Sequence, residues 1–193
     1  MKKVCKVVFP LYRQPTVIEL AFLENGMRVL KNFDMAIACP QSLEVNEHFG
    51  ELSALPLVRF GDHYFNSIEG YNQLMLSEEF YSSFAAYEHI LIHQADVFIF
   101  KDELQFWCNK GYAYIGPPWL RKPDRTIKKL FNYLRKLVQP GYGVKHNLVG
   151  NGGFSLRHVQ KHLNVLHTAP ATTLELYRMN THHLYNEDVF WSL

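Results

Sequence analysis

The sequence has few cysteines, and none lies in a pattern that would hold a metal or build a disulfide framework. Its 193 residues contain only Cys5, Cys39 and Cys108, with no Cys-x-x-Cys pair. This excludes zinc ribbons, thioredoxin-like redox motifs and small disulfide-rich secreted domains. Each cysteine lies in or beside apolar sequence, so we expect inert, buried thiols in a reducing compartment.

Long apolar runs are also missing. No stretch approaches the roughly 18 apolar residues of a membrane-spanning helix. Near the N-terminus, Lys6 and Pro10 interrupt the apolar residues before a signal-peptide core could form. We therefore predict a cytoplasmic protein, with attachment to the surface of the inner membrane as the alternative to a freely soluble one.

A strong excess of one charge is absent as well. The formal net charge is +2, which implies no obligatory nucleic-acid partner. Positive charge gathers at residues 121–136, on a helix expected over 124–138. This basic stretch has two interpretations: a solvated helix face, or a contact for an anionic membrane surface or an acidic acceptor. Nucleic acid is not expected there, because the basic residues lack interleaved aromatic side chains.

Short apolar runs alternate with helical patterns along the whole chain. Strands are expected at 3–10, 33–40, 55–60, 87–100 and 112–116, and helices at 15–23, 67–84, 102–111 and 124–138. Such alternation predicts one α/β domain, residues 1–193, with a mainly parallel central sheet flanked by helices. Sheets of this kind bind ligands outside the carboxyl ends of their strands.

The first stretch that could carry chemistry is "HQAD", residues 93–96. Side chains alternate along a strand, so a strand over 87–100 would place Gln94 and Asp96 on one face. An amide and a carboxylate together suit a divalent cation whose other ligands come from a bound diphosphate. The structural alternative is that Asp96 caps a turn, and the residues alone leave both readings open.

The second stretch is "GNGGFSLR", residues 150–157. Its glycines permit a positive φ or a close approach of the backbone to a ligand, and a tight turn is the structural alternative. It is not a phosphate-binding P-loop, because no Gly-Lys-Ser/Thr follows. It is not a Gly-x-Ser-x-Gly elbow either, so we expect Ser155 to cap a following helix rather than to act as a nucleophile.

The third stretch is "NEDVFW", residues 186–191. Glu187 and Asp188 open an apolar helical segment, and Asn186 is a suitable cap. Acidic residues in a first helical turn are favoured by the helix dipole, which is the structural reading. The functional reading is a general base, with its neighbour binding substrate hydroxyl groups.

In this order the three stretches, together with "YNQLMLSEEFYSSFAAYEHILIHQADVFIFKDELQFWCNKGYAYIGPPW", resemble a bacterial family of uncharacterised GT-A-type glycosyltransferases. The succession of an acidic motif, a Gly-rich segment and a Glu-Asp pair also resembles the β-1,4-galactosyltransferases. The resemblance spans about residues 58 to 191. It implies a GT-A-like nucleotide-diphospho-sugar transferase fold, with a nucleotide-sugar-binding half in residues 1–100 and an acceptor half in residues 101–193.

The resemblance also implies roles for the acidic residues. Asp188 would be the base of an inverting displacement, and Glu187 would contact the acceptor. Asp96 would hold a divalent cation, Mn or Mg, on the donor diphosphate. Gln94 stands where the family pattern has the first carboxylate of Asp-x-Asp, so Asp96 is the single carboxylate that carries over.

The resemblance, together with position along the chain, implies further contacts. Donor contacts are expected from Tyr12, Arg13, Tyr71, Asn72, Gln94 and Asp96; acceptor contacts are expected from Trp119, Asn151, Gly152, Gly153 and Glu187. Trp119 would stack on a sugar ring, with a tryptophan of the hydrophobic core as the alternative.

The implied activity is that of a hexosyltransferase-like enzyme of bacterial surface-glycan biosynthesis. It would move a sugar from a nucleotide-diphosphate donor to a hydroxyl group of a glycan or glycolipid. The chain ends at Leu193, just after Asp188, so we expect a truncated acceptor half or a reduced, weakly active or inactive form. The alternatives are a non-catalytic nucleotide- or sugar-binding module and a nucleotidyltransferase-like enzyme. The latter would usually need a Gly-rich loop after the first strand, which "FPLYRQPT" lacks.

Overall fold

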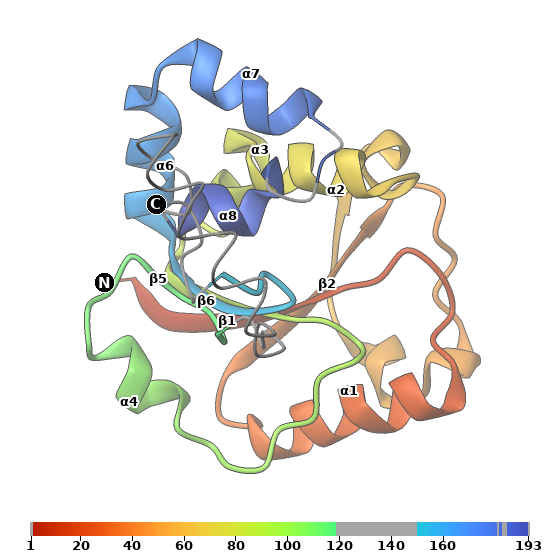
Figure 1. Cartoon of the computed structure of the whole chain (residues 1–193). Helices are drawn as coiled ribbons and strands as arrows, with labels where there is room; N and C mark the ends of the chain where they lie inside the picture. Colours follow the sequence, from red (N-terminus) through yellow and green to blue (C-terminus); the bar gives the residue numbers. More distant parts are fainter. Residues whose placement is uncertain (1, 119–149, 181, 183–184, 193) are drawn as a thin grey trace, which may run out of the picture.

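The chain forms a six-stranded sheet with helices on both faces (Figure 1). The computed structural model describes residues 2–118, 150–180, 182 and 185–192. The strands are β1 (Lys3–Pro10), β2 (Asp34–Pro40), β3 (Leu57–Phe60), β4 (Tyr87–His93), β5 (Tyr114–Ile115) and β6 (Phe154–His158). The helices are α1 (Val17–Val29), α2 (Ile68–Met75), α3 (Glu78–Ser82), α4 (Leu104–Cys108), α6 (Val159–Thr168), α7 (Ala171–Met179) and α8 (Glu187–Trp191), with 3-10 turns η1 (Glu47–Ala54) and η2 (Asp62–Phe65).

The strand order across the sheet is β3-β2-β1-β4-β6-β5. Strands β1 to β4 run parallel to one another, while β6 is antiparallel to both β4 and β5. The predicted fold class, α/β with a mainly parallel central sheet flanked by helices, is confirmed. The chain leaves β1 toward β2 on one side and returns as β4 on the other, so the sheet has a switch point between β1 and β4.

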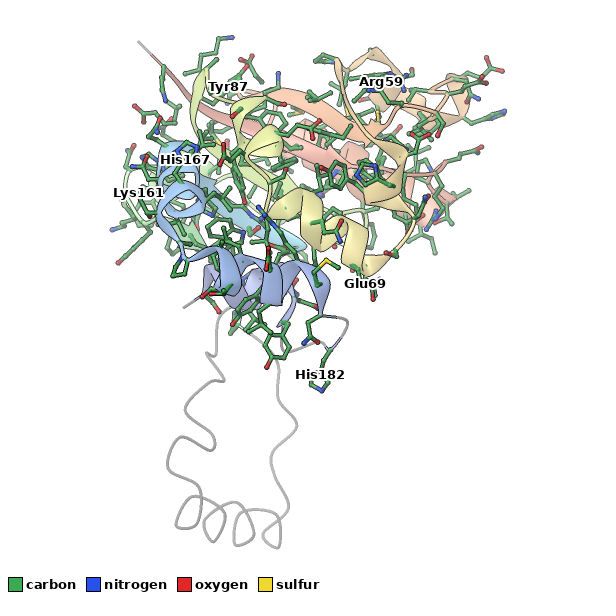
Figure 2. The ribbon with its side chains drawn as sticks, turned by 90° about the horizontal axis from the view of Figure 1, so that it is seen from above. Arg59, Glu69, Tyr87, Lys161, His167 and His182 are labelled. Atoms are coloured by element: carbon green, nitrogen blue, oxygen red, sulfur yellow. The ribbon has the colours of Figure 1, made fainter. Side chains whose placement is uncertain are left out.

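The central strands are apolar on both faces because helices cover both. Val7 and Phe9 of β1 pack in a core shared with α1 and α4, whereas Val8 packs in a second core with α2, α3 and α6. Figure 2 looks down on the second set of helices, with Lys161 and His167 projecting from α6 and Glu69 from α2. This two-sided burial explains why the strand sequences read as continuous apolar runs.

The strand expected over 87–100 is shorter than predicted. β4 ends at His93, and residues 94–96 turn, with the Val97 N–H donating to the Gln94 carbonyl at 3.2 Å. The following residues run back to α1, where the Ile99 N–H donates to Asn25 Oδ1 at 3.0 Å. His93 pairs with Phe154, the first residue of β6. Beyond His93, β4 therefore has no further residue of β6 to pair with. Asp96 is therefore exposed on a turn, and the predicted strand alternation of Gln94 and Asp96 is wrong.

Ser155 is not a helix cap, contrary to the prediction. It lies inside β6, opposite Ile92 of β4, and helix α6 begins only after His158. Pairing with β4 extends residues 154–158 into a strand, so the first helical turn is displaced toward the C-terminus.

The three cysteines are free and buried, as predicted. Across the described ranges, no helix is both long enough and apolar enough to cross a membrane. The predicted basic helix over 124–138, its basic stretch 121–136 and Trp119 lie outside the described residues. The division into a donor half and an acceptor half stays a prediction.

Candidate active site

A cleft of about 610 Å³ opens at the switch point, where β1 and β4 end. Segments from five places in the chain line it: the residues after β1, the start of α2, the turn after β4, the glycine-rich segment and the start of α8. All the predicted site residues that the structure describes line this cleft: Tyr12, Arg13, Tyr71, Asn72, Gln94, Asp96, Asn151, Gly152, Gly153, Glu187 and Asp188. Carboxyl ends of parallel strands are where such sheets bind ligands, so the cleft is the candidate active site.

The acidic pair at the start of α8 is buried at the wall of this cleft. Glu187 and Asp188 are only 3% and 8% exposed. Asp188 Oδ2 accepts a hydrogen bond from the Gly152 N–H at 3.2 Å, and Glu187 Oε1 accepts one from Arg157 Nη2 at 3.0 Å. The second oxygens, Asp188 Oδ1 and Glu187 Oε2, have no hydrogen-bond partner within the described part of the chain. Two buried acceptors are thus free for donors that a ligand would bring.

The surroundings of Asp188 weaken its acidity. Burial raises the pKa of Asp188 to about 6, and the nearby charge of Glu187 adds to the rise. The N–H groups of Gly152 and Val189 and the Arg157 guanidinium act in the opposite direction. A carboxylate with a pKa of about 6 is ionised at neutral pH and still basic enough to take a proton, which suits a general base.

Asn72 ties α2 to the start of α8. Its Oδ1 accepts a hydrogen bond from the Glu187 N–H, and its Nδ2 donates to Asn186 Oδ1, both at 3.3 Å. Asn186 therefore caps α8 by position, but its side chain bonds Asn72 rather than the helix. Asn72 has this structural task in addition to its predicted donor contact.

The glycines of "GNGG" are needed for space more than for backbone conformation. A Cβ on Gly152 would lie 2.2 Å from Glu187 Oε1, and one on Gly153 would lie 2.5 Å from Gln94 Oε1. Neither residue has a positive φ, unlike Gly150, whose φ is 150°. The close approach to a ligand stays a prediction, and in the structure the atoms closest to these glycines are side chains of the site itself.

Tyr71 is a lining residue of the cleft with a buried hydroxyl group. Its hydroxyl oxygen is buried and makes no hydrogen bond of ordinary geometry to the described residues, although the Gln94 amide lies nearby. Burial, with a contribution from the Glu187 charge, raises the pKa of Tyr71 to about 12. Tyr71 is therefore a neutral hydroxyl that is free to bond a ligand.

Arg13 is not a free cation. It forms a bidentate ion pair with Glu19, at 2.9 Å and 2.8 Å, and Glu19 also closes the capping box of α1. The hydrogen bonds from Arg13, together with the Thr16 N–H, lower the pKa of Glu19 to about 2. Among the described cleft residues Arg13 is the only basic side chain, against the carboxylates of Glu19, Asp96, Glu187 and Asp188. A bound diphosphate would thus need positive charge from another source.

A divalent cation fits this cleft only in company with a ligand. In residues 2–118 and the described positions from 150 onward, no three His, Cys, Asp or Glu side chains are grouped to hold a metal. Asp96 offers one exposed carboxylate, with Gln94 two residues before it. Magnesium-type sites are often of this kind, with one or two carboxylates and the rest of the shell from phosphates and water.

Arg157 is the residue of the site that sequence reasoning missed. It is completely buried and touches Glu187, although it lies in a strand far from α8 in the sequence. A signal was present in "FSLRH", because strand alternation puts Ser155 and Arg157 on one face and Phe154 and Leu156 on the other. A charged residue at an inward position of an apolar strand usually has a buried partner.

A family model described as "Protein of unknown function (DUF5672)" matches residues 54–193. No curated protein matches the chain. Similar solved structures include glucosyl-3-phosphoglycerate synthase from Mycobacterium tuberculosis, alone (13% identity, TM-score 0.47) and with uridine diphosphate (14%, 0.44). In both cases 92% of this chain and 64% of the other are covered.

A further similar structure is that of a mycobacterial protein, with 13% identity and a TM-score of 0.42, covering 82% of this chain and 54% of the other. The chain thus spans 54% to 64% of the length of these proteins.

Proposed function

The chain belongs to the DUF5672 family, and on that premise we propose that it is a GT-A-type glycosyltransferase that moves a sugar from a nucleotide-diphosphate donor to a hydroxyl acceptor. The observation that supports this most is the Glu187–Asp188 pair, which lines a cleft at the carboxyl ends of β1 and β4 and has two buried oxygens without a hydrogen-bond partner among the described residues. The family match covers this pair, Asp96 and the glycine-rich segment.

In the proposed reaction Asp188 is the general base. Its free oxygen, Oδ1, accepts the proton of the acceptor hydroxyl. At the same time the oxygen of that hydroxyl bonds the anomeric carbon from the face opposite the diphosphate. The bond from the anomeric carbon to the diphosphate oxygen breaks, and its electron pair leaves with the diphosphate, so the configuration inverts. Glu187 Oε2 accepts a hydrogen bond from a second hydroxyl of the acceptor and orients it. The transition state has oxocarbenium character, as in glycoside hydrolysis.

Asp96 and the neighbouring Gln94 would hold a divalent cation on the donor diphosphate. When bound, such a cation neutralises the charge that develops on the leaving diphosphate. The ion pair of Arg13 with Glu19 supports this role, since it leaves the described cleft without a free basic side chain. The glycan or glycolipid nature of the acceptor, the Trp119 contact and a membrane contact through residues 121–136 are predictions from the sequence.

A thermal-shift experiment tests the proposal. Nucleoside diphosphates and nucleotide-sugars, each with and without Mn²⁺, should raise the melting temperature by about 5 to 10 °C at 100 times the dissociation constant. Asp96→Asn should lose the Mn²⁺-dependent part of the rise, while the control Asp102→Asn should keep it. Asp102 is an exposed carboxylate near α4 whose capping bond to the Leu104 N–H an asparagine can replace. If no nucleotide shifts the wild-type protein, the transferase proposal fails; binding without transfer would favour the non-catalytic module.

The pH dependence of transfer should report Asp188. The base must be ionised, so the rate should fall about tenfold per pH unit below about pH 6 and level off above it. The groups that influence this pKa are Glu187, Arg157 and the N–H groups of Gly152 and Val189. Glu187→Gln removes a neighbouring negative charge and should move the fall in rate to lower pH. Turnover that stays constant from pH 5 to 8 would contradict the assignment of the base.

A further inference from the structure

Arg157 is a buried cation in the middle of β6. It is 0% exposed, and strand alternation turns it with Ser155 toward the core formed by α2, α3, α6 and α8. A charge in such a place is costly unless it is paired and its N–H groups are all bonded. The contacts that Arg157 makes therefore indicate why the fold keeps it.

Its guanidinium spans the two segments that build the acidic wall of the cleft. Nη2 donates to Glu187 Oε1 at 3.0 Å and reaches the Gly152 carbonyl at 3.4 Å. Nε donates to Ser155 Oγ at 2.9 Å, and the Ser155 hydroxyl donates to the same Gly152 carbonyl at 3.0 Å. On the other side of that residue, the Gly152 N–H donates to Asp188 Oδ2. One side chain thus touches Glu187 directly and Asp188 through Gly152.

Two contacts of Nη1 anchor the guanidinium itself, and one of them is to Met75 Sδ at 3.7 Å. Nη1 donates to the Tyr81 hydroxyl at 3.0 Å, and that hydroxyl donates to the Met75 carbonyl at 3.1 Å. Tyr81 comes from α3 and Met75 from α2, so the guanidinium is braced by two helices. Its planar fork makes these bonds in several directions at once, which the single ammonium of a lysine could not reproduce.

We propose that Arg157 is a positioning residue, which holds Glu187 in place through their ion pair and, through Gly152, aims Asp188 Oδ1 into the cleft. The expected effect of Arg157 on sugar transfer rests on the proposed function. The placing of Glu187 and Asp188 by Arg157 does not. Supporting evidence comes from the charges nearby. Burial alone would lower the pKa of Arg157, but Glu187, Tyr81 and Tyr114 together outweigh it and leave the pKa above its ordinary value. Burial and the Arg157 charge lower the pKa of His162 to about 3, so that neighbour stays neutral.

The decisive measurement is the titration of Asp188 by carbon-13 NMR, with Asp188→Asn to assign its carboxyl signal. Two variants are compared, Glu187→Gln and the double variant Arg157→Met/Glu187→Gln. Both lack the Glu187 charge and differ only in Arg157. The comparison therefore avoids a variant in which Glu187 stays buried as a carboxylate without its Arg157 partner. We expect a higher pKa for Asp188 in the double variant, and faster hydrogen exchange of the Gly152 amide. Equal titration curves and equal exchange would overturn the proposal.

Transfer kinetics give the second readout. Arg157→Met should lower kcat about 100-fold with little change in the KM for the donor, because misplacing a reacting group by about 1 Å has an effect of this size. Arg157→Lys should restore the titration of Asp188 but only part of kcat. Tyr81→Phe, which removes one brace of the guanidinium, should lower the melting temperature and shift the Asp188 titration less than Arg157→Met does. If Arg157→Lys lowers the melting temperature but has the Asp188 titration and the kcat of the wild type, the role of Arg157 is merely structural. That result would overturn the proposal.

The two proposals fail in different ways. If the wild-type protein neither binds a nucleotide nor transfers a sugar, the proposed function is wrong, yet the titration and amide exchange still decide whether Arg157 orients Asp188. If transfer occurs and the titration curves coincide, the proposed function stands and the role of Arg157 is wrong.

Discussion

Replacing Asp188 with asparagine should abolish sugar transfer while leaving donor binding almost unchanged. An amide cannot take the proton of the acceptor hydroxyl, and a general base contributes about 100- to 10,000-fold to a rate. The change is nearly isosteric, and the asparagine Oδ1 can still accept the hydrogen bond from the Gly152 N–H that Asp188 Oδ2 accepts at 3.2 Å. The glycine-rich segment should therefore keep its place, so that the loss is one of chemistry.

Two measurements check this prediction. Calorimetry with a nucleoside diphosphate and Mn²⁺ should give the same dissociation constant for the wild type and Asp188→Asn, and a coupled assay of diphosphate release should give the loss of turnover. Glu175→Gln is a matched control, since Glu175 is an exposed carboxylate on α7 outside the cleft. Undiminished turnover in Asp188→Asn would refute the base assignment, whatever happens to binding.

Replacing Gly152 with alanine should both destabilise the protein and disturb the acidic pair. The new Cβ would lie 2.2 Å from Glu187 Oε1, 3.2 Å from Asp188 Cβ and 3.3 Å from Arg157 Nη2. Glu187 cannot simply move aside, because it is buried and paired with the equally buried Arg157. Overpacking of this kind costs about 1–3 kcal/mol, or about 3 to 10 °C in the melting temperature of a domain of this size.

The neighbouring glycine supplies the control. A Cβ on Gly153 would lie 2.5 Å from Gln94 Oε1. Gln94 is only half-buried, however, and its hydrogen bond to the Gly153 carbonyl is donated by the Gln94 backbone N–H, not by the side chain. Its side chain can turn away, so we expect Gly153→Ala to be close to wild type in melting temperature. If calorimetric scans show equal stability for both variants, the close packing of Gly152 against the acidic pair is not a constraint.

Much of the fold follows from local sequence. The apolar runs ending at Pro10 and Pro40 form β1 and β2, and the helical pattern over 67–84 forms the two helices α2 and α3. Burial on both faces is encoded in each run itself, so it can be recognised without knowing the neighbours. The three chemical stretches could be recognised in the same way, because the glycines and the paired carboxylates are rare combinations over a few residues.

The errors came from contacts between distant segments. The strand expected to run to Phe100 stops at His93, because β6, its neighbour in the sheet, extends no further. Ser155 is a strand residue because residues 154–158 pair with β4. None of these outcomes is visible in the residues concerned, since each depends on which partner the fold brings close.

The sequence alone therefore determined that this protein is an α/β domain with acidic and glycine-rich stretches suited to a ligand, because periodicity and composition act over short distances along the chain. Only the tertiary structure decided that these stretches share one cleft, that Gly152 must be small, and that Arg157 joins them. The reason is physical. The cost of a buried charge or a crowded atom is set by the groups around it in space, and for Arg157 and Glu187 those groups lie 30 residues apart in the sequence.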